Sequence, residues 1–130
     1  MRRSDQRQAA VVALYQRDVT DRQADGLLDR RATAFTRELV QGVEREEPEL
    51  DRLIERYSQG WTLDRIAPLE RSILRVALFE LLHRADVPDE VAIDEAVEQA
   101  KDLCGADAPG FINGILGAVH RDRDTQAPSR

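Results

Sequence analysis

Residues 69–82 have the sequence LERSILRVALFELL, and this stretch indicates the fold class of the whole chain. Its apolar residues recur every three or four positions, which is the periodicity of an α-helix with one buried face. Pro68 precedes the stretch and suits the first turn of a helix, whereas residues 86–88, Asp-Val-Pro, break the pattern. We therefore predict a long helix that begins at Pro68. Its buried face is expected to comprise Ile73, Leu74, Ala77, Leu78, Leu81 and Leu82.

The segments on both sides of this helix have the same helical periodicity. Pro48 and Pro88 are placed to open helices at their first turns, and Gly60 and Gly105 are placed to end them. No run of alternating apolar and polar residues predicts a strand. The expected helices cover residues 4–17, 28–43, 48–57, 68–82, 88–103 and 107–119, with a short helical turn after Thr62.

These helices predict an all-α fold in which six to seven helices form two packed three-helix sub-bundles. The N-terminal sub-bundle is expected over residues 1–60 and the C-terminal one over residues 61–120. Because no low-complexity linker separates them, both are assigned to a single domain, residues 1–130, with one continuous core. Residues 121–130 are polar and are expected to form a flexible tail.

The composition limits the class of protein. With 42% hydrophobic and 34% charged residues, the chain is too apolar for a disordered protein and suits a soluble globular one. No apolar run approaches the roughly 18 residues that a membrane span needs, and the polar N-terminus lacks a signal-peptide core. A cytoplasmic location without membrane contact is therefore expected. Cys104 is the only cysteine, so an intrachain disulfide and a cysteine metal cluster are excluded.

The net charge of −6 is unevenly distributed along the chain. Residues 1–17 contain four arginines against Asp5 alone, whereas residues 86–107 contain eight acids against Lys101. An RNA partner would follow the arginines and avoid the acidic segment. That acidic segment is either a solvated helix face or a surface for a basic protein.

Motifs that would carry catalysis are absent from the sequence. Glu80-Leu81-Leu82-His83 matches one Glu-x-x-His pair, but a di-metal bundle needs two such pairs and two further glutamates. We therefore interpret Glu80 and His83 as a pair on a helix surface and expect no metal site. Nucleophile motifs and glycine-rich phosphate loops do not occur. The sequence predicts a binding protein without a cofactor and not an enzyme.

Three blocks in the second half of the chain carry a specific resemblance. They are residues 69–81 (LERSILRVALFEL) followed by Asp86-Val87-Pro88, residues 91–101 (VAIDEAVEQAK) and residues 111–116 (FINGIL). In this order and spacing they resemble the bacterial transcription antitermination factor NusB family. Residues 7–15, RQAAVVALY, resemble the opening helix of that family. The likeness covers most of the chain and is looser over residues 18–60.

The resemblance implies a function as well as an all-helical fold. Members of the family bind the boxA element of ribosomal RNA leaders together with a small-subunit ribosomal protein, NusE. The complex helps RNA polymerase to read through terminators as part of an antitermination complex. The implied role is binding without turnover.

The resemblance also implies site residues. For RNA it points to the arginine-rich start and to the region of the last helix. These candidates are Arg2, Arg3, Arg7, Tyr15, Asp107, Phe111 and Asn113. For the ribosomal protein it points to the long helix, with Glu70, Arg75 and Phe79. Ser4 and Asp5 stand where the family often has basic residues, so RNA binding without the partner is expected to be weak.

Two candidate roles and two alternative functions remain open at this point. Phe111 either stacks on a base or packs in the core, and Tyr15 serves either the RNA face or the core. Some ribosomal RNA cytosine methyltransferases carry a NusB-like domain, but they also need an α/β domain with a cofactor loop, which these 130 residues do not contain. A homodimer is the other alternative, and the sequence does not choose between monomer and dimer.

Overall fold

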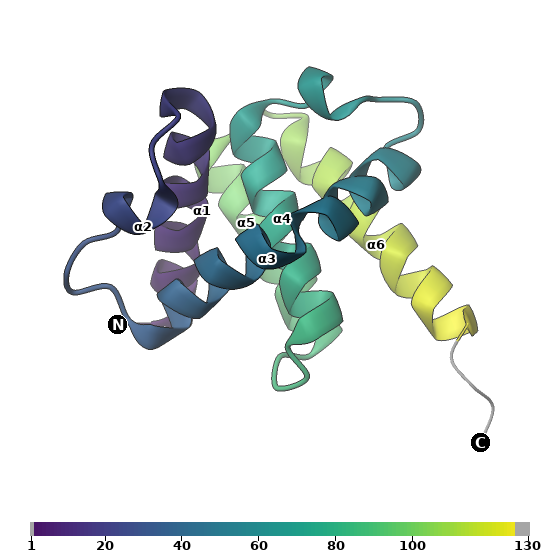
Figure 1. Ribbon diagram of the computed structural model, residues 1–130. Helices are drawn as coiled ribbons and strands as arrows, with labels where there is room; N and C mark the ends of the chain where they lie inside the picture. The colour runs from purple at the N-terminus through teal and green to yellow at the C-terminus, as the bar shows by residue number, and fades with distance from the viewer. Residues whose placement is uncertain (1, 127–130) are drawn as a thin grey trace.

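The computed structural model describes residues 2–126, without the side chains of residues 25, 125 and 126. Within this range it contains helices and no strand (Figure 1). Five helices are long, and two short helical segments lie in the connections. In chain order the elements are α1 Arg3–Thr20, α2 Ala24–Leu27, α3 Ala34–Tyr57, the 3-10 helix η1 Leu63–Arg65, α4 Pro68–His83, α5 Asp89–Leu103 and α6 Ala108–Gln126. The predicted all-α class is therefore confirmed.

The prediction that Pro48 opens a separate helix is wrong, because α3 continues through it. A proline inside a helix removes one backbone hydrogen bond and usually ends or kinks the helix. Here the apolar face on both sides of Pro48 is buried in the same core, with Val43 before it and Leu50 after it. Burial of that shared face offsets the missing hydrogen bond, so two predicted helices form one.

The predicted start of this helix at Leu28 is also wrong. Residues 28–33 form the connection to α3, and Thr33 caps the helix by accepting a hydrogen bond from the backbone N–H of Thr36 at 3.2 Å. A threonine at this position satisfies one of the free N–H groups of the first turn. The capping signal was present in the sequence, but the apolar periodicity extended past it.

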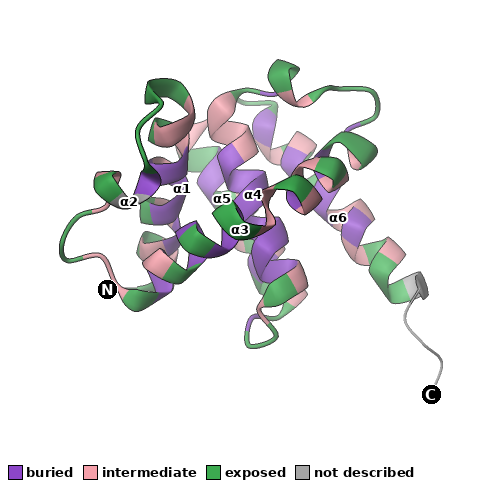
Figure 2. Cartoon of the chain, in the orientation of Figure 1, coloured by how far each residue is buried: buried purple, intermediate pink, exposed green. Residues whose placement is uncertain are grey.

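Helix α4 lies at the centre of the bundle and packs against α1, α3, α5 and α6 (Figure 1). Every residue from Ser72 to Leu81 is buried, so the helix is enclosed on all sides along this stretch (Figure 2). Pro68 occupies its first turn as predicted. The two halves of the chain thus share one core through α4, which explains why the sequence of this helix is so apolar.

The last helix is longer than expected. Helix α6 continues to Gln126, so residues 121–126 are helical and the predicted tail is wrong for this part. Tyr57 of α3 donates a hydrogen bond to Asp122 at 2.5 Å and Arg123 donates to the carbonyl of Leu81 at 2.8 Å, and these contacts hold the extension against the bundle. The rest of the predicted tail, residues 127–130, lies outside the described residues. Over the described range, no helix combines the length and the apolar character that a membrane crossing requires.

Candidate functional site

The first two arginines lie at the start of α1 and keep much of their surface in solvent. The Arg2 side chain is 84% exposed and forms only a loose ion pair with Asp5 at 3.7 Å. Arg3 is half-exposed, with its Nη1 3.5 Å from the Asp86 carboxylate and its guanidinium 4.1 Å from the centre of the Phe35 ring. Exposed pairs of this kind are weak, so both guanidinium groups are available to a phosphate.

Arg7 has a different environment from the other two, because it is buried at the interface of α1 and α4. Its side chain is 4% exposed and forms a two-pronged ion pair with Glu80, with Nε–Oε1 at 2.8 Å and Nη2–Oε2 at 2.9 Å. Glu80 is itself 1% exposed, so our interpretation of Glu80 as a helix-surface residue is wrong. A direct contact between Arg7 and RNA would require this ion pair to open, and Arg7 therefore has a structural position.

A further arginine joins this cluster from the far end of α4. The Arg84 guanidinium lies 5.2 Å from the centre of the Phe35 ring and donates to Asp86 at 3.0 Å and to Glu38 at 2.6 Å. The bonds to Asp86 and Glu38 hold the pKa of Arg84 above its usual range. Phe35 thus lies among Arg3, Arg7 and Arg84, a cluster that sequence spacing did not reveal because its members come from three separate segments.

The other RNA candidates lie toward the opposite end of the bundle. Helices α1 and α4 run antiparallel, because Arg7 contacts Glu80 near the end of α4 whereas Asp18 contacts Arg75 nearer its start. Tyr15 is half-buried and follows Arg3 by twelve residues, which is about 18 Å along a helix. The structure therefore separates Tyr15 from the N-terminal arginines. Asp107 and Asn113 are exposed, before and within the first turns of α6.

Phe111 lies beside Glu70, away from the arginines at the start of α1. Together with Trp61, Arg65 and neighbouring residues they line a small surface pocket of about 160 Å³ between η1, α4 and α6. Trp61 is 50% exposed and is one of the few large hydrophobic side chains on the surface. Burial raises the pKa of the Glu70 carboxyl above its ordinary value. Trp61 was not among the residues predicted from the sequence, although an exposed tryptophan is typical of an interaction site.

The remaining two partner candidates are buried in the core. Arg75 is 6% exposed and donates to Asp51 at 2.8 Å and to Asp18 at 2.7 Å. Phe79 is 4% exposed and packs across Gly42 of α3. Neither side chain presents a surface to a partner, so Glu70 is the one member of the predicted partner set at the molecular surface.

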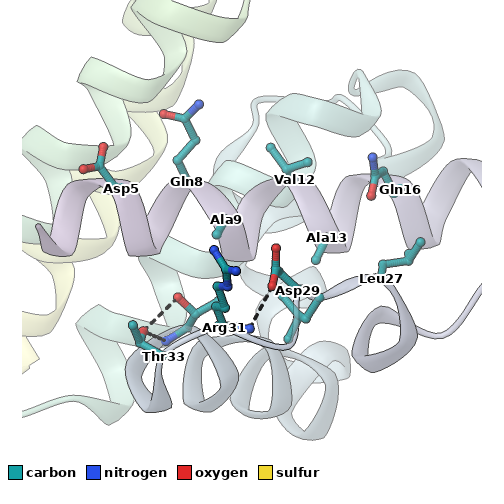
Figure 3. Close-up of a pocket in the computed structure, with 13 residues that line it drawn as sticks. Asp5, Gln8, Ala9, Val12, Ala13, Gln16, Leu27, Asp29, Arg31 and Thr33 are labelled. Carbon is teal, nitrogen blue, oxygen red and sulfur yellow. Dashed lines mark hydrogen bonds between the residues drawn. The ribbon is translucent and has the colours of Figure 1, made fainter. Parts of the chain in front are cut away.

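A groove of about 630 Å³ lies between α1 and the connection from α2 to α3 (Figure 3). It is lined by small apolar residues such as Ala9 and Ala13 and by the polar residues Gln8 and Arg31. The connection is held in shape by Asp29, whose carboxylate accepts a hydrogen bond from the backbone N–H of Arg31 at 2.8 Å (Figure 3). Arg31 is exposed, and it could not be predicted from the sequence because this connection has no periodicity that places it next to α1.

The described residues form an all-helical bundle with exposed arginines at one end and a pocket lined by Trp61, Glu70 and Phe111 at the other, and both features are typical of the surfaces of helical binding proteins. The family model described as "NusB family" matches residues 4–121. The chain therefore belongs to the NusB family, as its sequence blocks indicated.

Individual relatives agree with this assignment. The transcription antitermination protein NusB of Frankia casuarinae is 46% identical over 101 residues, which are 78% of this chain and 75% of the relative. The protein of the same name from Symbiobacterium thermophilum is 39% identical over 138 aligned positions, with 93% of this chain and 90% of the relative covered.

Solved structures of the family have the same fold. Thermotoga maritima NusB superposes with a TM-score of 0.84 at 33% identity, over 94% of this chain and 92% of that one. A crystal structure of antitermination factors NusB and NusE in complex with double-stranded RNA has a TM-score of 0.81 over 92% of this chain and 96% of that one. At 24% identity, that second likeness shows the fold alone.

Proposed function

We propose that this chain is a transcription antitermination factor. In this role it binds boxA-type RNA of ribosomal RNA leaders together with the small-subunit ribosomal protein NusE, within the antitermination complex of RNA polymerase. The observation that carries the proposal is the family match over residues 4–121, supported by relatives named transcription antitermination protein NusB. The solved complex of NusB, NusE and RNA supports the choice of partners. The role requires binding and no turnover, in the cytoplasm where nascent RNA is made.

The proposed RNA path follows α1. It begins at the exposed guanidinium groups of Arg2 and Arg3 and continues along the groove that contains Arg31. Tyr15 lies seven residues after the groove residue Gln8, which places both on one face of the helix. Arginines contribute affinity through phosphates, and a tyrosine ring provides a face on which a base can stack. Arg7 is not part of this path because it is buried in an ion pair with Glu80.

The proposed partner surface is the pocket of Trp61, Glu70 and Phe111. Binding a partner here would bury the exposed half of the Trp61 ring, and removing that apolar area from water is favourable. Large aromatic side chains of this kind dominate interface energetics. The Glu70 carboxylate beside it favours a basic protein, which a ribosomal protein is. Asp107 and Asn113 lie before and within the first turns of the same helix as Phe111, so they stand near this surface.

The RNA proposal is tested by fluorescence anisotropy with a boxA RNA and a scrambled RNA, over a series of salt concentrations and with NusE present. We expect the wild type to prefer boxA. The double variant Arg2→Ala/Arg3→Ala should bind more weakly and reduce the salt slope by about 0.7–0.9 per lost phosphate contact. A matched control, Arg52→Ala/Arg56→Ala, removes the same charge from the exposed far half of α3 and should leave the slope unchanged.

Equal binding of both RNAs by the wild type would contradict the boxA proposal. An unchanged slope in the Arg2→Ala/Arg3→Ala variant would contradict the assignment of these arginines. A further variant, Arg31→Ala, tests the groove, since its slope should fall only if RNA passes along α1 as proposed.

A further inference from the structure

Three side chains with metal-binding atoms converge where α3 passes the end of α4. His83 Nε2 lies 2.9 Å from a Glu49 carboxylate oxygen and 3.9 Å from a Glu46 carboxylate oxygen. One donor atom from each of the three lies within 4.8 Å of the others. Glu46 and Glu49 are three residues apart on α3 and therefore share a helix face. His83 is the last residue of α4, so the cluster joins two helices.

The position of the histidine ring is set by the packing of the two helices. Phe79 lies across Gly42 of α3, where a Cβ atom would come within 2.1–2.7 Å of its ring. This close approach is possible only at glycine, and it brings the end of α4 toward α3. The His83 ring then stacks on Phe79, with centroids 5.4 Å apart and planes at 29°. Stacking limits rotation of the imidazole and keeps Nε2 directed at the two carboxylates.

We propose that Glu46, Glu49 and His83 bind a divalent transition-metal ion of the zinc class. Zinc bonds to imidazole nitrogen and carboxylate oxygen at about 2.0–2.2 Å, so neighbouring ligand atoms of a tetrahedral site lie about 3.3–3.6 Å apart. The distances of 2.9 Å and 3.9 Å fall on either side of that spacing, and small side-chain rotations would equalise them. Three protein ligands leave a fourth position for water.

The donor set also distinguishes among ions. Calcium takes six to eight oxygen ligands and magnesium demands octahedral oxygen geometry, so neither suits one imidazole and two carboxylates. Imidazole with carboxylates suits zinc and its neighbours among the transition metals. The ligands are half-buried or exposed, so an ion can reach the site. Arg45 donates a hydrogen bond to Glu46 at 2.9 Å and would have to release that carboxylate, which costs little because the Arg45 side chain is 64% exposed and is easily solvated.

The second histidine of the chain provides an internal contrast. His120 also has two carboxylates near it, but Asp89 lies 2.8 Å from its Nδ1 and Asp124 lies 3.5 Å from its Nε2. The two ring nitrogens face in different directions, so these three groups cannot chelate one ion. At His83, by contrast, the carboxylates of Glu46 and Glu49 both face the same ring nitrogen, Nε2, and this geometry carries the proposal.

Isothermal titration of the full chain with zinc chloride, without an affinity tag, tests the proposal. We expect saturable binding with one ion per chain. His83→Gln and Glu49→Gln should each weaken it at least tenfold, because each removes a ligand. The control variants His120→Gln and Cys104→Ser should bind as the wild type does. Circular dichroism checks that each variant is folded, and Glu46→Gln, which preserves side-chain size, gives a third test of the ligand set.

Cobalt(II) gives an independent readout. Bound at this site it should produce visible absorption bands of a four-coordinate complex in the wild type and in His120→Gln, and lose them in His83→Gln. Two results would overturn the proposal. One is the absence of one-to-one binding to the wild type, in which case the cluster is an ordinary ion pair. The other is wild-type affinity in His83→Gln, in which case the ion binds elsewhere.

Discussion

Arg7 of α1 and Glu80 of α4 form an ion pair in the protein core, with two parallel hydrogen bonds of 2.8 Å and 2.9 Å. Both side chains are almost fully buried, and the Arg7 Nη1 atom also lies 3.6 Å from Glu95 of α5. Paired hydrogen bonds of this kind are the strongest geometry available to arginine and a carboxylate. The pair fixes α1 against the central helix and sets its register there.

Replacing Arg7 with alanine is expected to destabilise the protein by about 3–5 kcal/mol, because it leaves the Glu80 carboxylate buried without a partner. Urea denaturation followed by circular dichroism measures this change. Arg3→Ala, which removes an exposed guanidinium from the same helix, is the control and should cost less than about 1 kcal/mol. If Arg7→Ala lowered the free energy of unfolding as little as the control does, the buried ion pair would not matter for stability.

Gly42→Ala is expected to destabilise the protein by about 1–3 kcal/mol, because the added methyl group collides with the Phe79 ring. Gly114→Ala in α6 is the matched control. A Cβ atom there meets nothing within 4 Å, so this variant should gain up to about 1 kcal/mol from helix propensity. Thermal denaturation of both variants gives the comparison. A stable Gly42→Ala protein would mean that Phe79 can move without cost.

Glu70→Lys is expected to weaken binding of NusE and to leave the fold intact, because Glu70 is half-buried at the edge of the pocket that contains Trp61 and Phe111. Reversing the charge replaces an attraction for a basic protein with a repulsion. Titration calorimetry with purified NusE measures the affinity, and Glu44→Lys, at an exposed position of α3 outside the lining of the pocket, serves as the control. Unchanged affinity of Glu70→Lys would remove this pocket from the proposed interface.

The stability of the protein should depend on pH through Glu70. Burial raises the pKa of this carboxyl in the folded state above its ordinary value of 4.5, so folding favours the protonated form. The stability that the protonated Glu70 carboxyl contributes is fully present below its ordinary pKa. It is lost as the pH rises through the raised pKa of the folded state. Glu70→Gln, which cannot ionise, should therefore be more stable than the wild type at neutral pH. The difference in melting temperature should vanish below about pH 4, and a constant difference at all pH values would count against the burial effect.

Much of the fold could be predicted from the sequence because helices are encoded locally. The stretch from Pro68 to Leu82 and the block from residue 91 to 101 each carry the helical period, and the structure contains α4 and α5 there. Prediction was wrong at Pro48, where a local rule favoured a helix start. Burial of Val43 and Leu50 in one core favoured continuity, and that tertiary contribution prevailed.

The candidate site was harder to predict, because exposure depends on contacts between distant segments. Arg2, Arg3 and Arg7 look alike in the sequence, yet Arg7 is withdrawn from the surface by Glu80, 73 positions away. Arg75 and Phe79 share a helix with Glu70, but only Glu70 reaches the pocket at the surface.

The sequence by itself determined the helical class, the central helix and the family, since these depend on residue order and periodicity. Only the tertiary structure decided which charged groups are available to a partner and which are structural. It also brought His83 to Glu46 and Glu49, which lie on a different helix. The physical reason is the same in both cases. The residue type determines the charge of a side chain, but the packing of the helices determines its solvent exposure and its neighbours.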